Sequence, residues 1–143
     1  MELRDIMTRK VEVVSGDATL KEAATKMKAL DVGLIPVCDG DRLKGILTDR
    51  DITIRATADG RDPTKTKVAD VRSTDIAYGL EDQEVEEAVS LMEARQIRRL
   101  PVLNQDKCLV GIVSLGDIAV HVGDTDLAGE TLQEISQPAA PKR

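Results

Sequence analysis

Two stretches of the chain place apolar residues at helical spacing, with polar residues between them. In the first stretch these residues lie at i, i+3, i+4, i+7 and i+10: Leu20, Ala23, Ala24, Met27 and Leu30. The second stretch repeats the first four of these positions: Val85, Ala88, Val89 and Met92. This spacing predicts two amphipathic helices, each with one buried stripe. Thr19 and Glu22 form a candidate capping box at the start of the first helix.

Each predicted helix is followed by two short apolar runs that a polar turn separates. In the first half, "LIPVC" (34–38) and "LKGIL" (43–47) flank the turn "DGDR". In the second half, "LPVL" (100–103) and "LVGIV" (109–113) flank "NQDKC". Apolar runs on either side of an Asp-Gly or Asn-rich turn predict β-hairpins.

Shorter elements complete each half. A helical turn opens each one, at "LRDIM" and "VADVR", and a second helix begins near Thr48 and near Ser114. We also expect a short strand before each amphipathic helix, around Val11–Val14 and around Ile76–Tyr78. Both halves therefore have the order β-α-β-β-α, which predicts an α+β fold.

The chain contains an internal repeat of two copies. A shift of 65 residues aligns identical positions, such as Asp17 with Asp82 and Pro36 with Pro101. A one-residue insertion in a turn then changes the shift to 66, which aligns further identities, including Gly45 with Gly111 and Asp51 with Asp117. One copy of roughly 60 residues has too small a core to be stable alone. We therefore expect the two copies to pack around a pseudo-twofold axis, with two equivalent clefts between them.

The predicted boundaries follow the repeat. Residues 1–60 form the first copy, 61–67 the linker and 68–124 the second copy. Residues 125–143 form a C-terminal helix, through Leu127, Leu132 and Ile135, and then a tail. The linker lies within "DGRDPTKTK", whose glycine, proline and charges indicate a loop.

A shared motif links the hairpin to the second helix in each copy. "GILTDRD" (45–51) and "GIVSLGD" (111–117) both run glycine, two aliphatic residues, a hydroxyl residue, two variable residues and aspartate. A hydroxyl at the N-cap with a carboxylate three residues later is typical of a capping box. The same pair could instead contact a nucleotide, with the carboxylate on the two ribose hydroxyls and the helix N-terminus near phosphate. Gly45 and Gly111 would let a neighbouring backbone pass closely.

Composition narrows the function. The 143 residues include 41% hydrophobic and 32% charged residues, with Tyr78 as the only aromatic residue. A net charge of −6 and the lack of stacking rings disfavour binding to nucleic acids or anionic membranes. The N-terminus has no apolar signal core, and no apolar run approaches the roughly 18 residues of a membrane span. We expect a cytoplasmic protein.

These motifs resemble the cystathionine-β-synthase (CBS) domain family. "LIPVC" with "GILTDRD", and "RRLPVL" with "GIVSLGD", carry the resemblance, which covers nearly the whole chain as a tandem pair, or Bateman module. "GLIPVC", "LTDRDI" and "QIRRLPV" are similar to the small stand-alone two-CBS proteins of actinobacteria, including the hypoxic response protein 1 type. The resemblance implies clefts that bind AMP, ADP, ATP or S-adenosylmethionine, although some members bind none detectably.

The resemblance also implies roles for particular residues. Asp51 and Asp117 would hold ribose hydroxyls, and Thr48 and Ser114 would approach phosphate. Arg98 and Arg99 match basic positions that meet phosphate in nucleotide-binding relatives. The same arginines could equally be a solvated helix end, where a cation favours the dipole.

Catalysis is not expected, because the sequence has no Walker loop, G-x-S-x-G or H-E-x-x-H motif. The spacing of Cys38, Cys108 and His121 does not support a metal site. Two function classes remain. The first is a nucleotide-sensing regulatory protein that needs no cofactor and acts in trans, as a homodimer, on an unknown protein partner. The second is a ligand-free stress-response interaction protein that responds to redox state or zinc.

Overall fold

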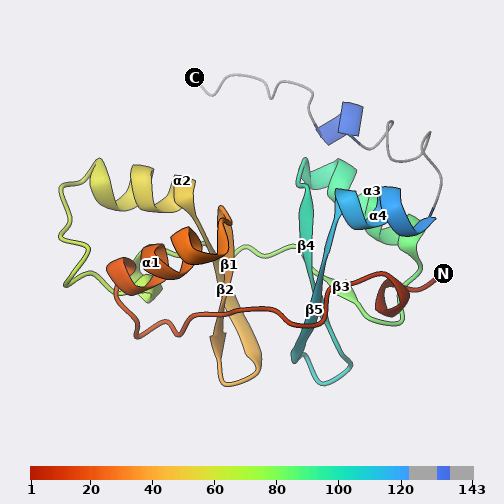
Figure 1. The fold of residues 1–143 in the computed structure, drawn as a ribbon, viewed down its shortest axis with the longest axis horizontal. Coiled ribbons are helices and arrows are strands. Elements are labelled where there is room, and N and C mark those ends of the chain that lie inside the picture. The colour runs from red at the N-terminus through yellow and green to blue at the C-terminus, as the bar shows by residue number, and fades with distance from the viewer. Residues whose placement is uncertain (123–131, 136–143) are drawn as a thin grey trace. The chain divides into compact units, whose positions relative to one another are not determined.

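The computed structural model describes residues 1–122 and 132–135, which fall into two compact units (Figure 1). The first-repeat unit is Glu12–Ile76. The second-repeat unit combines Met1–Val11 with the described residues from Ala77 onward. The units therefore do not coincide with the two sequence copies, because each contains the opening helical turn of the other copy.

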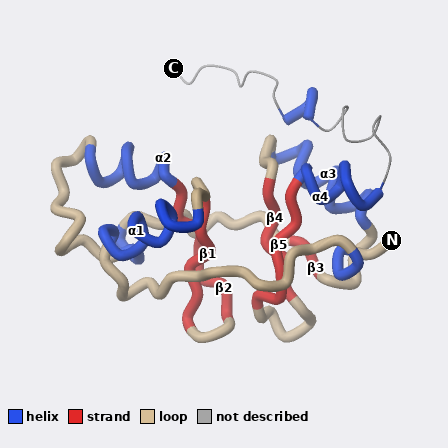
Figure 2. The backbone as a smooth tube through the Cα atoms, in the orientation of Figure 1, coloured by secondary structure: helices blue, strands red, loops and turns tan. Residues whose placement is uncertain are grey.

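The first-repeat unit contains one hairpin, one amphipathic helix and the helix that begins after Thr48, here called the motif helix. Its elements are α1 (Leu20–Leu30), β1 (Leu34–Asp39), β2 (Arg42–Thr48), α2 (Asp49–Asp51), the π-helical η2 (Ile52–Thr57) and the 3-10 turn η3 (Val68–Asp70). β1 and β2 pair antiparallel, and η2 continues α2 directly (Figure 2). The hairpin, the amphipathic helix and the helix after Thr48 are as predicted.

The second-repeat unit has the same elements with one more strand. They are η1 (Leu3–Asp5), β3 (Gly79–Leu80), α3 (Val85–Arg95), β4 (Arg99–Leu103), β5 (Leu109–Ser114) and α4 (Leu115–Val122). The sheet order is β3-β4-β5, with β3 parallel to β4 and β5 antiparallel to it. The mixture of small sheets and helices confirms the α+β prediction.

The strands predicted before the amphipathic helices are wrong in position. In the first-repeat unit only Val14 pairs with β1, through an isolated bridge to Val37. In the second-repeat unit the strand is β3, after the predicted Ile76–Tyr78. There Gly79 and Leu80 pair with Val102 and Leu103 of β4, and an added Cβ at Gly79 would come 2.5 Å from Leu3 Cδ1.

The amphipathic stripe of α1 is narrower than predicted. Leu20, Ala23 and Met27 are buried, whereas Ala24 is exposed and Leu30 is 42% exposed. Half of the predicted capping box is present: the Glu22 N–H donates to Thr19 Oγ1 over 3.2 Å, but within the described residues the Thr19 N–H makes no return bond to the Glu22 side chain. The helix therefore presents only one row of side chains to a hairpin that is two strands wide.

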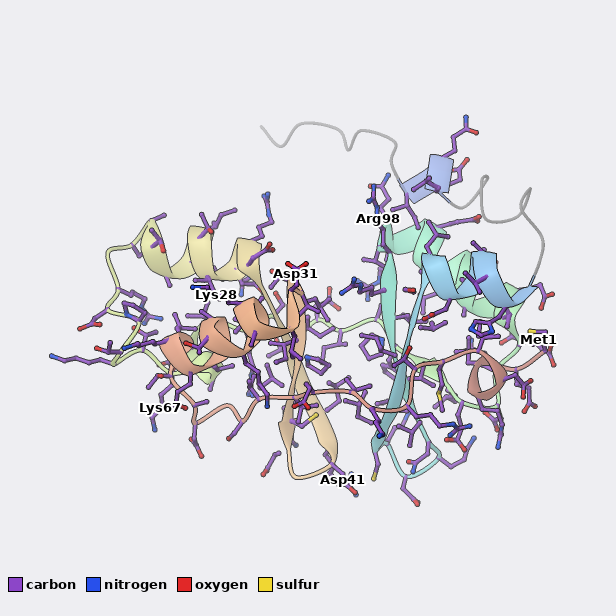
Figure 3. The ribbon with its side chains drawn as sticks, in the orientation of Figure 1. Met1, Lys28, Asp31, Asp41, Lys67 and Arg98 are labelled. Carbon is purple, nitrogen blue, oxygen red and sulfur yellow. The ribbon has the colours of Figure 1, made fainter. Side chains whose placement is uncertain are left out.

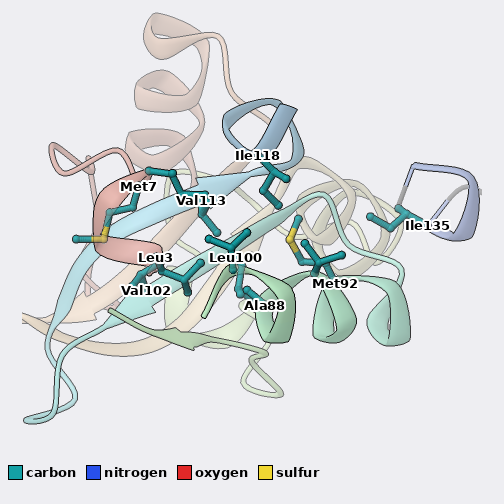
Figure 4. Close-up of a cluster of buried hydrophobic side chains, with 12 residues drawn as sticks. Leu3, Met7, Ala88, Met92, Leu100, Val102, Val113, Ile118 and Ile135 are labelled. Atoms are coloured by element: carbon teal, nitrogen blue, oxygen red, sulfur yellow. The ribbon is translucent and has the colours of Figure 1, made fainter. Parts of the chain in front are cut away.

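A separate aliphatic core fills each unit. In the second-repeat unit η1, α3, β4, β5 and α4 all contribute to one cluster (Figure 4). Leu3, Met92, Leu100, Val113 and Ile118 are fully buried there. The first-repeat unit has an equivalent cluster around Leu20, Ile35, Val37 and Leu47. Burial of each aliphatic side chain contributes about 1.5–3 kcal/mol to folding.

The opening segments are attached through the same backbone junction in both units. Thr8 and Ile112 exchange two backbone hydrogen bonds of 2.9 and 3.0 Å, and Ser73 and Ile46 do the same. Thr8 and Ser73 are equivalent positions of the repeat, as are Ile112 and Ile46. The same backbone pairing therefore occurs once in each unit, at equivalent positions of the repeat.

The C-terminal prediction falls largely outside the described residues. Residues 123–131 and 136–143 are not described, and these include Leu127. Residues 132–135 are helical, and Ile135 packs in the core of the second-repeat unit. In the described ranges, no helix has the length and apolar character needed to span a bilayer.

We expect Gly111→Ala to destabilise the protein by about 1–3 kcal/mol, because overpacking at a fixed backbone cannot relax freely. An added Cβ at Gly111 would lie 2.6 Å from Met7 Sδ and 2.9 Å from the Thr8 carbonyl oxygen. Urea unfolding measures the change. Gly116→Ala is the matched control, because its nearest neighbour is Ser114 Oγ at 3.5 Å. An equal loss in both variants would contradict the close crossing.

Candidate functional site

The repeated motif forms the same helix cap in both units. In the first-repeat unit the Asp51 N–H donates to Thr48 Oγ1, and the Thr48 N–H donates to Asp51 Oδ2, both over 3.0 Å. In the second-repeat unit the corresponding distances between Ser114 and Asp117 are 3.1 and 2.9 Å. The capping interpretation is therefore confirmed for both copies.

The cap leaves part of each carboxylate available, and the two copies use that part differently. In the first-repeat unit Asp51 Oδ1 accepts a hydrogen bond from the Ser73 hydroxyl over 3.2 Å. Arg55 Nε lies 3.8 Å from the same oxygen. Asp51 is only 9% exposed. Its carboxylate is therefore already engaged by the protein's own donors.

Asp117 is less engaged. Within the residues described, its carboxylate accepts only the Ser114 N–H, and the side chain is partly exposed. Thr8, the counterpart of Ser73, is exposed and donates no hydrogen bond to Asp117 in this part of the chain. Asp117 Oδ1 is consequently the freer acceptor of the two motif carboxylates.

Two arginines lie beside the second motif. Arg99 in β4 pairs directly with Ser114 in β5, and the Leu115 N–H donates to the Arg98 carbonyl over 2.9 Å. Both side chains are exposed, and Figure 3 shows Arg98 at the end of β4. Neither guanidinium forms an ion pair within residues 1–122 and 132–135. The fold thus brings Arg98, Arg99, Ser114 and Asp117 to one end of the hairpin.

The first motif has no such cations at the matching positions. Gly33 and Leu34 take the places of Arg98 and Arg99: Leu34 pairs with Thr48, and the Gly33 carbonyl accepts the Asp49 N–H over 3.0 Å. The Asp49 carboxylate also lies against Gly33, since an added Cβ there would be 3.1 Å from Asp49 Oδ2. At the positions of Arg98 and Arg99 the first repeat therefore carries no cation and has Asp49 beside them, and its cations near the motif are Arg50 and Arg55.

Sequence reasoning missed Ser73 and Arg55, which engage Asp51 from outside the motif. One sequence signal could have indicated a role for Ser73. It aligns with Thr8 in the repeat, and both hydroxyl residues follow the helical turn that opens a copy. Pairing of the opening segment with β2 is a long-range contact, and spacing along the chain does not reveal it.

The cysteines and the histidine do not form a site in the described part of the chain. There, no group of three or more His, Cys, Asp or Glu side chains is placed to hold a metal ion. Neither cysteine forms a disulfide. Cys38 is buried, and burial, with a smaller contribution from Asp41, raises the pKa of its thiol. A buried thiol of this kind is less reactive than an exposed one.

The chain belongs to the CBS domain family, whose model matches residues 3–56 and 68–124. It is 48% identical to the CBS domain-containing protein YhcV of Bacillus subtilis over 134 residues, 94% of each chain. It is 42% identical to hypoxic response protein 1 of Mycobacterium tuberculosis over 120 residues, 83% of each. The tandem CBS arrangement and the predicted resemblance are thereby confirmed.

Solved structures agree with the family. A crystal structure of hypoxic response protein I with two coordinated zinc ions has a TM-score of 0.78 and 41% identity, and covers 85% of this chain and 98% of that one. A CBS domain pair in complex with 5′-methylthioadenosine and S-adenosyl-L-methionine has a TM-score of 0.73 and 24% identity, and covers 86% of this chain and 96% of that one. The latter similarity supports the fold alone.

We expect Asp51→Ala to destabilise the protein more than Asp117→Ala. Loss of a cap costs about 0.5–2 kcal/mol in either case. Asp51→Ala additionally removes the acceptor of the Ser73 hydroxyl, which contributes about a further 1 kcal/mol. Chemical denaturation of both variants measures the difference. A larger loss for Asp117→Ala would show that the extra donors around Asp51 contribute nothing to stability.

Proposed function

We propose that this protein is a non-catalytic regulatory CBS pair that binds an adenosine-containing nucleotide mainly through the motif of its second repeat. Asp117 would accept the ribose hydroxyls, and Ser114, Arg98 and Arg99 would contact phosphate. The observation that carries the proposal is the freer Asp117 carboxylate at the hairpin end where two guanidinium groups lie that form no ion pair among the described residues.

The chemistry of the second motif suits this ligand. A carboxylate oxygen without a partner can accept a hydrogen bond from a ribose hydroxyl, and a guanidinium can donate two parallel hydrogen bonds to a phosphate. Hydrogen bonds to charged groups contribute about 1.5–3 kcal/mol each. A CBS domain pair of the same fold has been solved in complex with 5′-methylthioadenosine and S-adenosyl-L-methionine, which makes adenosine compounds the first ligands to test.

The first motif is a weaker candidate in this proposal. For Asp51 to hold a ribose, its carboxylate would have to exchange the Ser73 hydroxyl for a ligand hydroxyl, with no net gain of a hydrogen bond. Thr48 caps its helix as Ser114 does. However, the residue next to Gly33, the counterpart of Arg98, is the acidic Asp49. We therefore assign Thr48 and Asp51 a structural role first and a ligand role second.

Calorimetric titration with AMP, ATP and S-adenosylmethionine tests the proposal. We expect Arg98→Ala and Asp117→Ala each to weaken nucleotide affinity roughly tenfold or more, since each removes about 1.4 kcal/mol or more of contact energy. Arg61→Ala is the matched control, because Arg61 is an exposed arginine of the connector.

Asp51→Ala provides a second control in the same titration. It should lose more folding stability than Asp117→Ala but less nucleotide affinity, which separates a binding role from a capping role. Absence of binding heat with all three ligands would contradict the proposal, as would unchanged affinity in Arg98→Ala and Asp117→Ala.

The second candidate function is a stress-response protein that responds to redox state or zinc without a nucleotide. The similarity to hypoxic response protein I, whose crystal structure holds two zinc ions, favours it. The buried Cys38 thiol with its raised pKa argues against a reactive cysteine at that position. A thermal shift with zinc but none with nucleotide would favour this candidate.

We also propose that the protein acts as a homodimer in the cytoplasm, through the helices that follow the two motifs. Ile54 and Val120 occupy equivalent positions of the repeat and are 47% and 78% exposed. Ala56 and Ile118, on the same two helices, are buried in their own units. The exposed aliphatic pair is therefore the candidate contact.

Val120→Glu, combined with Ile54→Glu, is expected to convert the dimer to a monomer, because each change places a charge in an apolar contact. Size-exclusion chromatography with light scattering measures the mass. Leu30→Glu is the control, since Leu30 is 42% exposed and belongs to α1, not to either of the helices that follow the motifs. A wild-type protein that is monomeric, or a double variant that remains dimeric, would exclude this interface.

A further inference from the structure

We propose that the first-repeat unit carries a second ligand site, a pocket for a small oxyanion of the phosphate type that is built on Arg72. The site involves none of the residues assigned to nucleotide binding, and it does not depend on the proposed function.

Two glycines make room for the side chain of Arg72. An added Cβ at Gly45 would lie 2.7 Å from Arg72 Cδ, and one at Gly16 would lie 3.1 Å from Arg72 Nη1. The aliphatic part of Arg72 therefore lies across β2, and its guanidinium group reaches the loop before α1. Any larger residue at Gly45 would displace it.

The guanidinium group of Arg72 is partly buried, and its Nε atom has no partner in the part of the chain that the structure describes. That atom is also shielded from solvent. Within the described residues, Arg72 also forms no ion pair. A charged donor that has lost water without gaining an acceptor is unfavourable, and an anion that supplies the missing acceptor would be stabilised there.

A pocket of about 380 Å³ opens beside this guanidinium group. Ser15, Cys38, Lys44 and Arg72 contribute to its lining, as do the carboxylate residues Asp17 and Asp39. The Asp17 side chain is 92% exposed and lies 3.8 Å from Lys67 Nζ, so its charge is directed to solvent and partly balanced. The pocket therefore offers a guanidinium group, an ammonium group and a hydroxyl to an oxyanion, and the exposed Asp39 carboxylate is the lining charge that opposes it.

The second repeat shows that the fold does not require an arginine at this position. Met7 is the counterpart of Arg72, and it covers Gly111 as Arg72 covers Gly45. Met7 is only 8% exposed and belongs to an apolar core. An apolar side chain thus serves the structural purpose, and the arginine in the first-repeat unit calls for a different explanation, which anion binding supplies.

The pocket is distinct from the capped motif of the same unit. Ser73, the next residue after Arg72, pairs with β2 and directs its hydroxyl to Asp51. Successive side chains of an extended segment point to opposite sides. Arg72 and Ser73 therefore serve two separate places, the pocket and the helix cap.

Titration of the full chain with inorganic phosphate, at constant ionic strength set by chloride, tests the proposal. Thermal unfolding and the Nε–H resonances of the arginines report binding. We expect a saturable rise in Tm and a saturable shift of the Arg72 Nε–H signal. In the Arg98→Ala background, where the proposed phosphate contact of the second repeat is weakened, Arg72→Met, which copies the residue of the other repeat, should lose the saturable rise and keep only the general stabilisation that phosphate gives any protein.

Three further variants complete the test. Lys44→Gln changes an exposed residue and should weaken phosphate binding several-fold without loss of folding. Arg98→Ala and Asp117→Ala should leave the Arg72 response unchanged, which separates this site from nucleotide binding. A wild-type protein without a saturable response would overturn the proposal, as would an equal response in Arg72→Met or a response that disappears in Arg98→Ala.

Discussion

The close backbone crossing at Gly45 and Gly111 is the constraint on which the rest of the structure depends. At each glycine the opening segment of one sequence copy pairs with the last strand of the other copy's hairpin. A Cβ at either position would lie 2.9 Å from a carbonyl oxygen of that segment. Because the backbone cannot move aside without breaking two hydrogen bonds, only glycine is compatible with this pairing.

The crossing also determines which side chains reach the hairpin from outside. It brings Ser73 to the Asp51 carboxylate and Arg72 to the loop before α1. In the other unit it brings Thr8 and Met7 to the corresponding places. One backbone arrangement therefore presents two different pairs of side chains, and the chemistry of each unit follows from residues that lie far from its motif in the sequence.

Much of the local structure could be predicted from the sequence, because its causes are local. The stripe from Leu20 to Met27, the turn between β1 and β2 and the reciprocal cap at Thr48 each follow from residues a few positions apart. The short strand β3 was placed too early, since its position is defined by pairing with Val102 and Leu103 of β4, which are distant in the sequence. The engagement of Asp51 by Ser73 was missed for the same reason. The shared motif pattern predicted two equivalent sites, whereas contacts with residues distant in the sequence make the surroundings of Asp51 and Asp117 different.

Duplication followed by divergence explains why the two motifs have different capacities. Both keep the cap, since a helix begins after each hairpin and needs its first N–H groups satisfied. Where the cap is not affected, charges differ: Arg98 and Arg99 replace Gly33 and Leu34, whereas Asp49 occurs only in the first copy. In the proposed function an oxyanion is therefore preferred at the motif of the second-repeat unit. In the first-repeat unit the proposed anion site is built on Arg72, away from the motif, so the two proposed sites lie at different points of the same fold.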